Sequence, residues 1–201
     1  NHLKEIAGAL EPHGLDAMLL TSQPGEFYAV GFHGEGAVLV SGGECRYYTD
    51  PRYTEAAGRE VSGALVCETG REQPLRCQLQ QAVEELGIAR LGFEQGYMTV
   101  AEHKRYAASL SCALAPAQKL VDELRAVKDG EELERMEKAQ AITDEAFSAI
   151  LEFLRPGVTE QAVAARLQYE MLRRGAERMS FDPIVVSGPN GSLPHGVPSE
   201  R

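Results

Sequence analysis

The sequence lacks two features that would point to a membrane or a nucleic acid. No apolar run approaches the roughly 20 residues that a helix needs to cross a bilayer. Positive charge is also scarce, because 20 lysines and arginines stand against 30 acidic residues, for a net charge of -10. Such a charge repels nucleic-acid phosphates and anionic lipid surfaces. We therefore expect neither a nucleic acid nor a membrane as a partner.

Cysteine chemistry is similarly limited. The four cysteines, at positions 45, 67, 77 and 112, form no CxxC pair and have no histidines at metal-binding spacing. This pattern argues against a disulfide or zinc framework and predicts buried thiols in a reducing compartment, hence a cytoplasmic protein. The first 118 residues also contain no GxGxxG, Walker A or HExxH motif.

Residues 1–118 show short apolar runs that alternate with segments of helical periodicity. The predicted strands cover about five runs: 16–20, 37–40, 45–49, 64–67 and 90–93. The predicted helices lie around 3–10, 26–32, 51–60, 74–86 and 99–110, with Asp50 and Thr99 as N-caps of the third and the last. This order predicts an α/β fold, with a mixed sheet flanked by helices.

Residues 119–201 have a different pattern, and we interpret Ala115-Pro116-Ala117 as the linker before them. Asp129, followed by Glu132, predicts a capping box at the start of a helix that continues to Leu154. Thr159 is predicted to cap the next helix. Met136 and Met171 are predicted core residues. The glutamates are interpreted as a solvated face, at positions 131, 132, 134, 137 and 145.

Two histidines are candidate site residues. Ile184-Val185-Val186 predicts a buried strand, and the following loop places His195 between Pro194 and Gly196. Proline restricts the backbone before the histidine, and glycine leaves space after it, which suits a histidine that contacts a ligand. A solvated surface histidine fits the same pattern. His33 lies in a second glycine-rich loop, where either a ligand contact or simple solvation is consistent with the sequence.

Five motifs give the chain a family resemblance. FYAVGF (27–32) and YTDPRY (48–53) are similar to segments of the creatinase-type N-terminal domain. LRAVKD (124–129), LRPGVTE (154–160) and the final SGPN…PHGVPSER (187–201) resemble the opening of the pita-bread metallopeptidase domain. That family includes Xaa-Pro aminopeptidases, Xaa-Pro dipeptidases (prolidases), methionine aminopeptidases and creatinase. The resemblance implies a creatinase-like domain over 1–118 and the start of an α+β pita-bread domain over 119–201.

The resemblance also implies a chemistry. It implies a metal-dependent exopeptidase that cleaves Xaa-Pro bonds in short proline-containing peptides and forms a homodimer. Two divalent ions (Mn, Co or Zn) would be held by two Asp, one His and two Glu, which are expected after Arg201, so no metal ligand is expected within residues 1–201. His195 would hydrogen-bond the substrate, and His33 would border the active site of a second subunit.

Two other functions share these motifs. One is a different hydrolase on the same scaffold, such as a creatinase, and the other is a non-catalytic pseudo-peptidase that serves as a binding module. The predicted helices and the predicted last strand would also leave apolar faces uncovered, which soluble monomers rarely do. We therefore expect the physiological protein to be longer and these 201 residues alone to be inactive.

Overall fold

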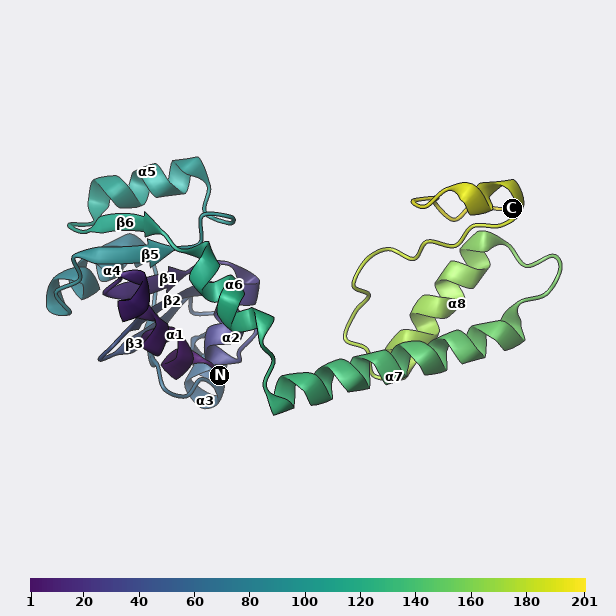
Figure 1. Cartoon of the computed structure of the whole chain (residues 1–201), viewed down its shortest axis with the longest axis horizontal. Helices are drawn as coiled ribbons and strands as arrows, with labels where there is room; N and C mark the ends of the chain where they lie inside the picture. Colours follow the sequence, from purple (N-terminus) through teal and green to yellow (C-terminus); the bar gives the residue numbers. More distant parts are fainter. The chain divides into compact units, whose positions relative to one another are not determined.

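A six-stranded mixed sheet forms the centre of the first of two compact units. The computed structural model describes all of residues 1–201, divided into Asn1–Val127 and Lys128–Arg201. The strand order is β4-β3-β2-β1-β5-β6. Figure 1 labels the strands from β3 to β6 in this order. The strands are β1 (Ala17–Leu20), β2 (Gly36–Ser41), β3 (Cys45–Thr49), β4 (Leu65–Glu68), β5 (Arg90–Phe93) and β6 (Ala113–Pro116). The central β1 pairs antiparallel with β2 and parallel with β5, so the predicted mixed α/β sheet is confirmed.

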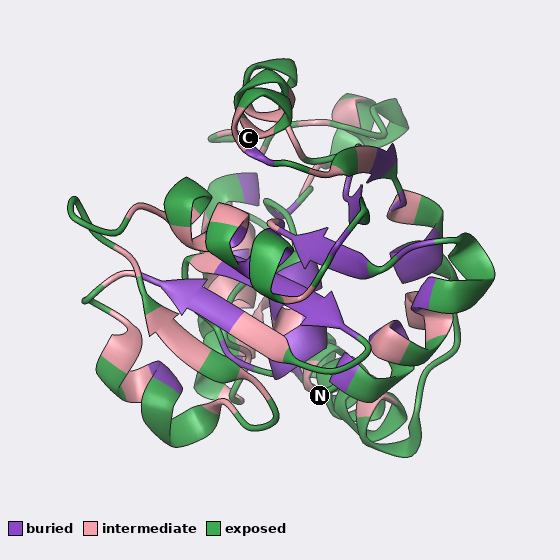
Figure 2. Ribbon diagram, turned by 90° about the vertical axis from the view of Figure 1, so that its left-hand side faces the viewer, coloured by how far each residue is buried: buried purple, intermediate pink, exposed green.

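Helices cover both faces of this sheet. One face packs against α1 (Leu3–Leu10), α2 (Gln23–Val30), α3 (Thr54–Glu60) and α6 (Gln118–Ala126), and the other against α4 (Leu75–Glu85) and α5 (Val100–Ser109). Along β1, Met18 and Leu20 enter the first cluster while Ala17 and Leu19 enter the second. Because side chains on both faces of β1 enter a core, the whole strand is apolar and buried. Figure 2 shows buried strands at the centre of this unit.

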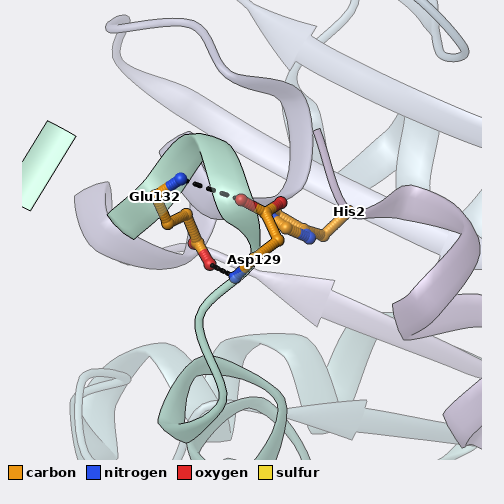
Figure 3. Close-up of side chains that lie close together, drawn as sticks. All are labelled: His2, Asp129 and Glu132. Carbon is orange, nitrogen blue, oxygen red and sulfur yellow. Dashed lines mark hydrogen bonds between the residues drawn. The ribbon is translucent and has the colours of Figure 1, made fainter. Parts of the chain in front are cut away.

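The second unit is built on two helices, α7 (Gly130–Phe153) and α8 (Glu160–Arg173), followed by a short 3-10 turn, η2 (Gly188–Ser192). The Asp129 carboxylate accepts the Glu132 backbone N–H at 2.8 Å, and the Glu132 carboxylate accepts the Asp129 N–H at 3.0 Å (Figure 3). The Thr159 hydroxyl accepts the Ala162 N–H at 3.1 Å. The two predicted helix starts are thus confirmed by their caps.

Three predicted elements need correction. The third helix begins at Thr54 rather than at Pro51, because Asp50 and Pro51 form a turn in which the Asp50 carboxylate accepts the Arg52 N–H at 2.9 Å. β6 was not predicted, since Pro116 suggested a linker. Proline is tolerated here because it ends a strand at the sheet edge. The predicted strand over residues 184–186 has no strand neighbour in the chain and does not form.

Several predicted core positions are more exposed than expected. Met136 is 56% exposed and Met171 is half-buried, whereas the apolar residues that α7 and α8 bury are Ala146, Ile150 and Val163. Cys77 is exposed on the outer side of α4, and the other three cysteines are half-buried rather than buried; all four are free thiols.

The predicted domain boundary, between 118 and 119, falls at the start of α6, whereas the first compact unit ends after it, at Val127. The reason is packing, because Leu120 and Val121 of α6 are fully buried in the same core as α1. None of the helices combines the length and the apolar character that crossing a membrane requires.

Candidate functional site

His195 lies in a tight turn that follows η2 in the second unit. Its side chain is exposed, and the turn closes behind it where the Gly196 N–H donates to the Leu193 carbonyl at 3.2 Å. A Cβ on Gly196 would lie only 2.4 Å from Cγ1 of Val186, so a side chain at this position would force the turn to move. Gly196 therefore allows the histidine turn to pack against the preceding extended segment.

The loop that carries His195 is attached at both ends to one carboxylate. Oε1 of Glu160 accepts the Ser187 N–H at 2.6 Å and the Ser187 hydroxyl at 2.9 Å. Oε2 accepts the Ser199 N–H at 3.0 Å and the Ser199 hydroxyl at 2.7 Å. Glu160 is only 2% exposed. The hydrogen bonds, led by the Ser199 hydroxyl, lower the pKa of Glu160 to about 2, so it is ionised at neutral pH.

His33 lies in the loop between α2 and β2 of the first unit. Its exposed imidazole stacks on the Phe27 ring, with ring centroids 4.0 Å apart and planes within 12°. Phe27 belongs to α2, so the ring that supports His33 is fixed on a helix. His33 and His195 belong to separate units, and each has its own support.

A buried glutamate also holds the His33 loop. Glu26, 2% exposed, accepts the Tyr47 hydroxyl at 2.9 Å and the backbone N–H groups of Gly34 and Gly36. Burial is the largest effect on this carboxyl and raises its pKa above the usual range, despite these hydrogen bonds. Burial, followed by the neighbouring Glu26, also raises the pKa of Tyr47 well above its usual range.

The residues around His195 do not form a metal site. No group of three or more His, Cys, Asp or Glu side chains with suitable geometry includes His195. The nearby Glu160 already uses both carboxylate oxygens to accept hydrogen bonds from serines, and it is buried. The side chains near this histidine therefore do not fit a dinuclear metal centre.

Sequence reasoning missed the two glutamates that support the histidine loops. Glu160 was noted only as the end of the LRPGVTE motif, and Glu26 only as part of a helical turn. A usable signal existed for Glu160, because serines at both ends of a proline- and glycine-rich loop supply the donors that a helix-terminal carboxylate can accept. The hydrogen bonds of Glu26 come mostly from backbone groups, which leave no trace in the sequence.

Each of the two compact units matches a separate protein-family model. Residues 2–127 match the creatinase/prolidase N-terminal domain, and residues 134–201 match metallopeptidase family M24. The chain therefore belongs to the creatinase/prolidase family. The related metallopeptidases of family M24 use divalent metal ions.

Individual relatives agree with this assignment. The chain is 42% identical over 201 residues to Uncharacterized peptidase YqhT of Bacillus subtilis and 29% identical over 203 residues to an Xaa-Pro dipeptidase of Pyrococcus horikoshii. These matches cover 99% of the chain but only 56% and 55% of the two relatives, so the chain spans about half of their length.

Solved structures show the same relationship. The chain is similar to an Xaa-Pro dipeptidase from Bacillus anthracis, with a TM-score of 0.92 at 35% identity over 99% of this chain and 56% of that one. It is also similar to an X-Pro aminopeptidase from Thermotoga maritima, with a TM-score of 0.89 at 28% identity over 100% of this chain and 57% of that one.

Proposed function

We propose that these residues serve a metal-dependent exopeptidase that hydrolyses Xaa-Pro bonds in short peptides, as an aminopeptidase or a dipeptidase. The observation that carries the proposal is the exposed imidazole of His195 on a loop with two fixed ends, within the part of the chain that matches metallopeptidase family M24. The relatives described as Xaa-Pro dipeptidase and X-Pro aminopeptidase suggest the substrate class.

In this proposal His195 acts as a hydrogen-bond donor to the substrate. Hydrolysis of a peptide bond passes through a tetrahedral intermediate in which the former carbonyl oxygen becomes negative. A donor that is already in position stabilises this charge without having to reorganise. The two divalent ions would be Mn, Co or Zn, held by residues other than those around His195.

The test of this role is a single substitution in the complete protein. His195→Ala should lower kcat on the dipeptide Ala-Pro by about 10²–10³-fold, the cost of losing one such donor. The fold should persist, because the side chain is exposed. Ser192→Ala in the same loop is the matched control, since its hydroxyl bonds only the Pro189 carbonyl, at 3.3 Å. Normal turnover by His195→Ala would contradict the assignment.

The same protein can be assayed on related substrates. Ala-Pro, a longer Ala-Pro peptide and creatine separate a dipeptidase, an aminopeptidase and a creatinase. Metal analysis of the purified protein accompanies these assays, because a protein that holds no divalent ion and hydrolyses none of the three would be a binding module instead.

We further propose that the protein is a homodimer in which His33 contributes to substrate binding. The role of His33 is supported by its exposed ring, which stacks on Phe27 with ring centroids 4.0 Å apart. The homodimer is what the family resemblance implies. A contact made equally in the bound and reacting states affects KM alone. His33→Ala should therefore raise KM for Ala-Pro several-fold and leave kcat unchanged, while sedimentation equilibrium gives twice the subunit mass. An unaltered KM, or a monomer, would remove the corresponding part of the proposal.

A further inference from the structure

The amino-terminal end of α8 is covered by the final segment of the chain. The first turn of a helix leaves backbone N–H groups without partners inside the helix. Here the Glu160 N–H donates to the Arg201 carbonyl at 2.8 Å and the Gln161 N–H to the Ser199 carbonyl at 3.1 Å. The Ala162 N–H is taken by Thr159. The helix end is thus completed by the residues that close the His195 loop.

The loop is also constrained between its two attachment points. The Asn190 N–H donates to the Ser187 carbonyl at 3.1 Å, and the Leu193 N–H donates to the Asn190 carbonyl at 2.9 Å. The Gly196 N–H then donates to Leu193, as described above. This chain of short turns runs from the Ser187 attachment to His195, so the position of the imidazole depends on where the attachment holds the loop.

Glu160 faces donors only. The four hydrogen bonds that it accepts come from two backbone N–H groups and two hydroxyls, with no lysine or arginine among them. A second buried carboxylate on the same helix, Glu170, is different, because it is paired with Arg166 of its own helix and with Arg174, the residue that follows the helix. Glu170 therefore stabilises α8, whereas Glu160 connects α8 to the loop.

We propose that Glu160 is a positioning residue, whose single carboxylate holds both ends of the loop 187–199 and thereby fixes the place of His195. This inference rests on the proposed function, because His195 has a role in turnover only if the protein is the proposed peptidase. The hold on the loop itself can be measured without any activity.

The decisive variant is Glu160→Gln. The amide keeps the shape of the side chain but replaces one acceptor oxygen by an NH₂ group, which can accept neither the N–H nor the hydroxyl of the serine that it faces. One end of the loop should therefore detach. Glu177→Gln is the matched control, since Glu177 is exposed and lies just after the same helix.

The first readout is amide hydrogen exchange of residues 187–199 in the complete protein. Exchange should become at least about tenfold faster in Glu160→Gln and stay unchanged in Glu177→Gln, because local opening exposes the loop amides. If Glu160→Gln does not fold, Ser199→Ala removes one hydroxyl donor and should give a smaller acceleration at the same end. Unchanged exchange in the folded variants would overturn the inference.

The second readout is kinetic. Because small displacements of a catalytic group cost up to about 10²-fold, Glu160→Gln should lower kcat on Ala-Pro at least about tenfold with little change in KM. In a His195→Ala background the same substitution should have no further effect, since the residue that it positions is gone. Independent, multiplying effects would overturn the inference. Normal activity of His195→Ala would instead contradict the proposed function, while the exchange result would still decide whether Glu160 holds the loop.

Discussion

At the scale of single residues, buried glutamates organise the loops of this protein. Glu26 and Glu160 each accept several hydrogen bonds from a loop that carries a candidate histidine. Glu94, 1% exposed, does the same at the corner between β1 and α2, where it accepts the N–H groups of Thr21 and Ser22 at 2.8 and 2.9 Å. Each carboxylate replaces the water that these backbone donors would otherwise need.

Glu26 and Glu160 respond to pH in opposite directions. Hydrogen bonds lower the pKa of Glu160, so its contribution to stability is present above the ordinary value of 4.5 and is lost as pH falls toward about 2. Burial raises the pKa of Glu26, so the folded state binds a proton more tightly than the unfolded state does. Stability due to Glu26 is therefore present at low pH and falls as pH rises from 4.5 through the raised pKa.

A neutral residue at position 26 should remove this dependence. Relative to the original protein, Glu26→Gln should gain free energy of unfolding as pH rises from about 4.5 to 7, because the amide has no charge to bury. Urea denaturation at a series of pH values measures the difference. Glu60→Gln, at an exposed position, provides the control and should show no such trend. A pH-independent difference for Glu26→Gln would mean that the burial of charge at this site has no energetic weight.

At the scale of elements, helix starts were predicted best where a capping side chain marks the first turn. The caps at Thr99, Asp129 and Thr159 are all present, because a side-chain oxygen at the first turn is a local signal. The strand predicted at 184–186 did not form, because a strand needs a hydrogen-bonded neighbour that no local pattern reveals. The boundary at 118 has a similar origin, since only tertiary packing shows that α6 shares a core with α1.

The packing of β5 gives a quantitative test at this scale. A Cβ on Gly92 would meet Leu15 Cδ1 at 2.8 Å, Met18 Sδ at 2.9 Å and Ala117 Cβ at 3.0 Å. Gly92→Ala should therefore cost about 1–3 kcal/mol through overpacking. Gly8→Ala in α1 meets nothing within 4 Å and should instead stabilise the protein by roughly 0.5–1 kcal/mol, since alanine favours a helix. Chemical denaturation of both variants measures the contrast, and equal effects would contradict the packing argument.

At the scale of the whole molecule, the two units differ in how completely they cover their apolar residues. The first unit places helices on both faces of its sheet and buries most of its large apolar side chains there. In the second unit Phe147 is 58% exposed and Leu151 56%. Periodicity correctly predicted the helices but could not say what, if anything, covers each stripe, because that depends on partners distant in the sequence.

The candidate site was predictable only in part. The family was correctly predicted from short motifs in the right order. His195 and His33 were predicted from their glycine-rich loops, and their roles stay predictions. The supports of the two histidines were not predicted, because hydrogen bonds between Glu160 and residues 27 and 39 positions away are set by the fold. What a sequence shows readily is the exposed reactive group, whereas the buried anchor behind it requires the structure.

The two-ended attachment at Glu160 has a consequence for how the loop can change in length. Closing a flexible loop becomes harder only slowly as residues are added, by about 0.6 kcal/mol for each doubling. Closure entropy alone therefore sets little limit on insertions between Ser187 and Ser199, as long as both serines remain and the turns from Ser187 to Gly196 can re-form. An insertion on either side of His195 would move the imidazole while both ends of the loop stay attached to Glu160. The position of the imidazole can thus change without any change in α8.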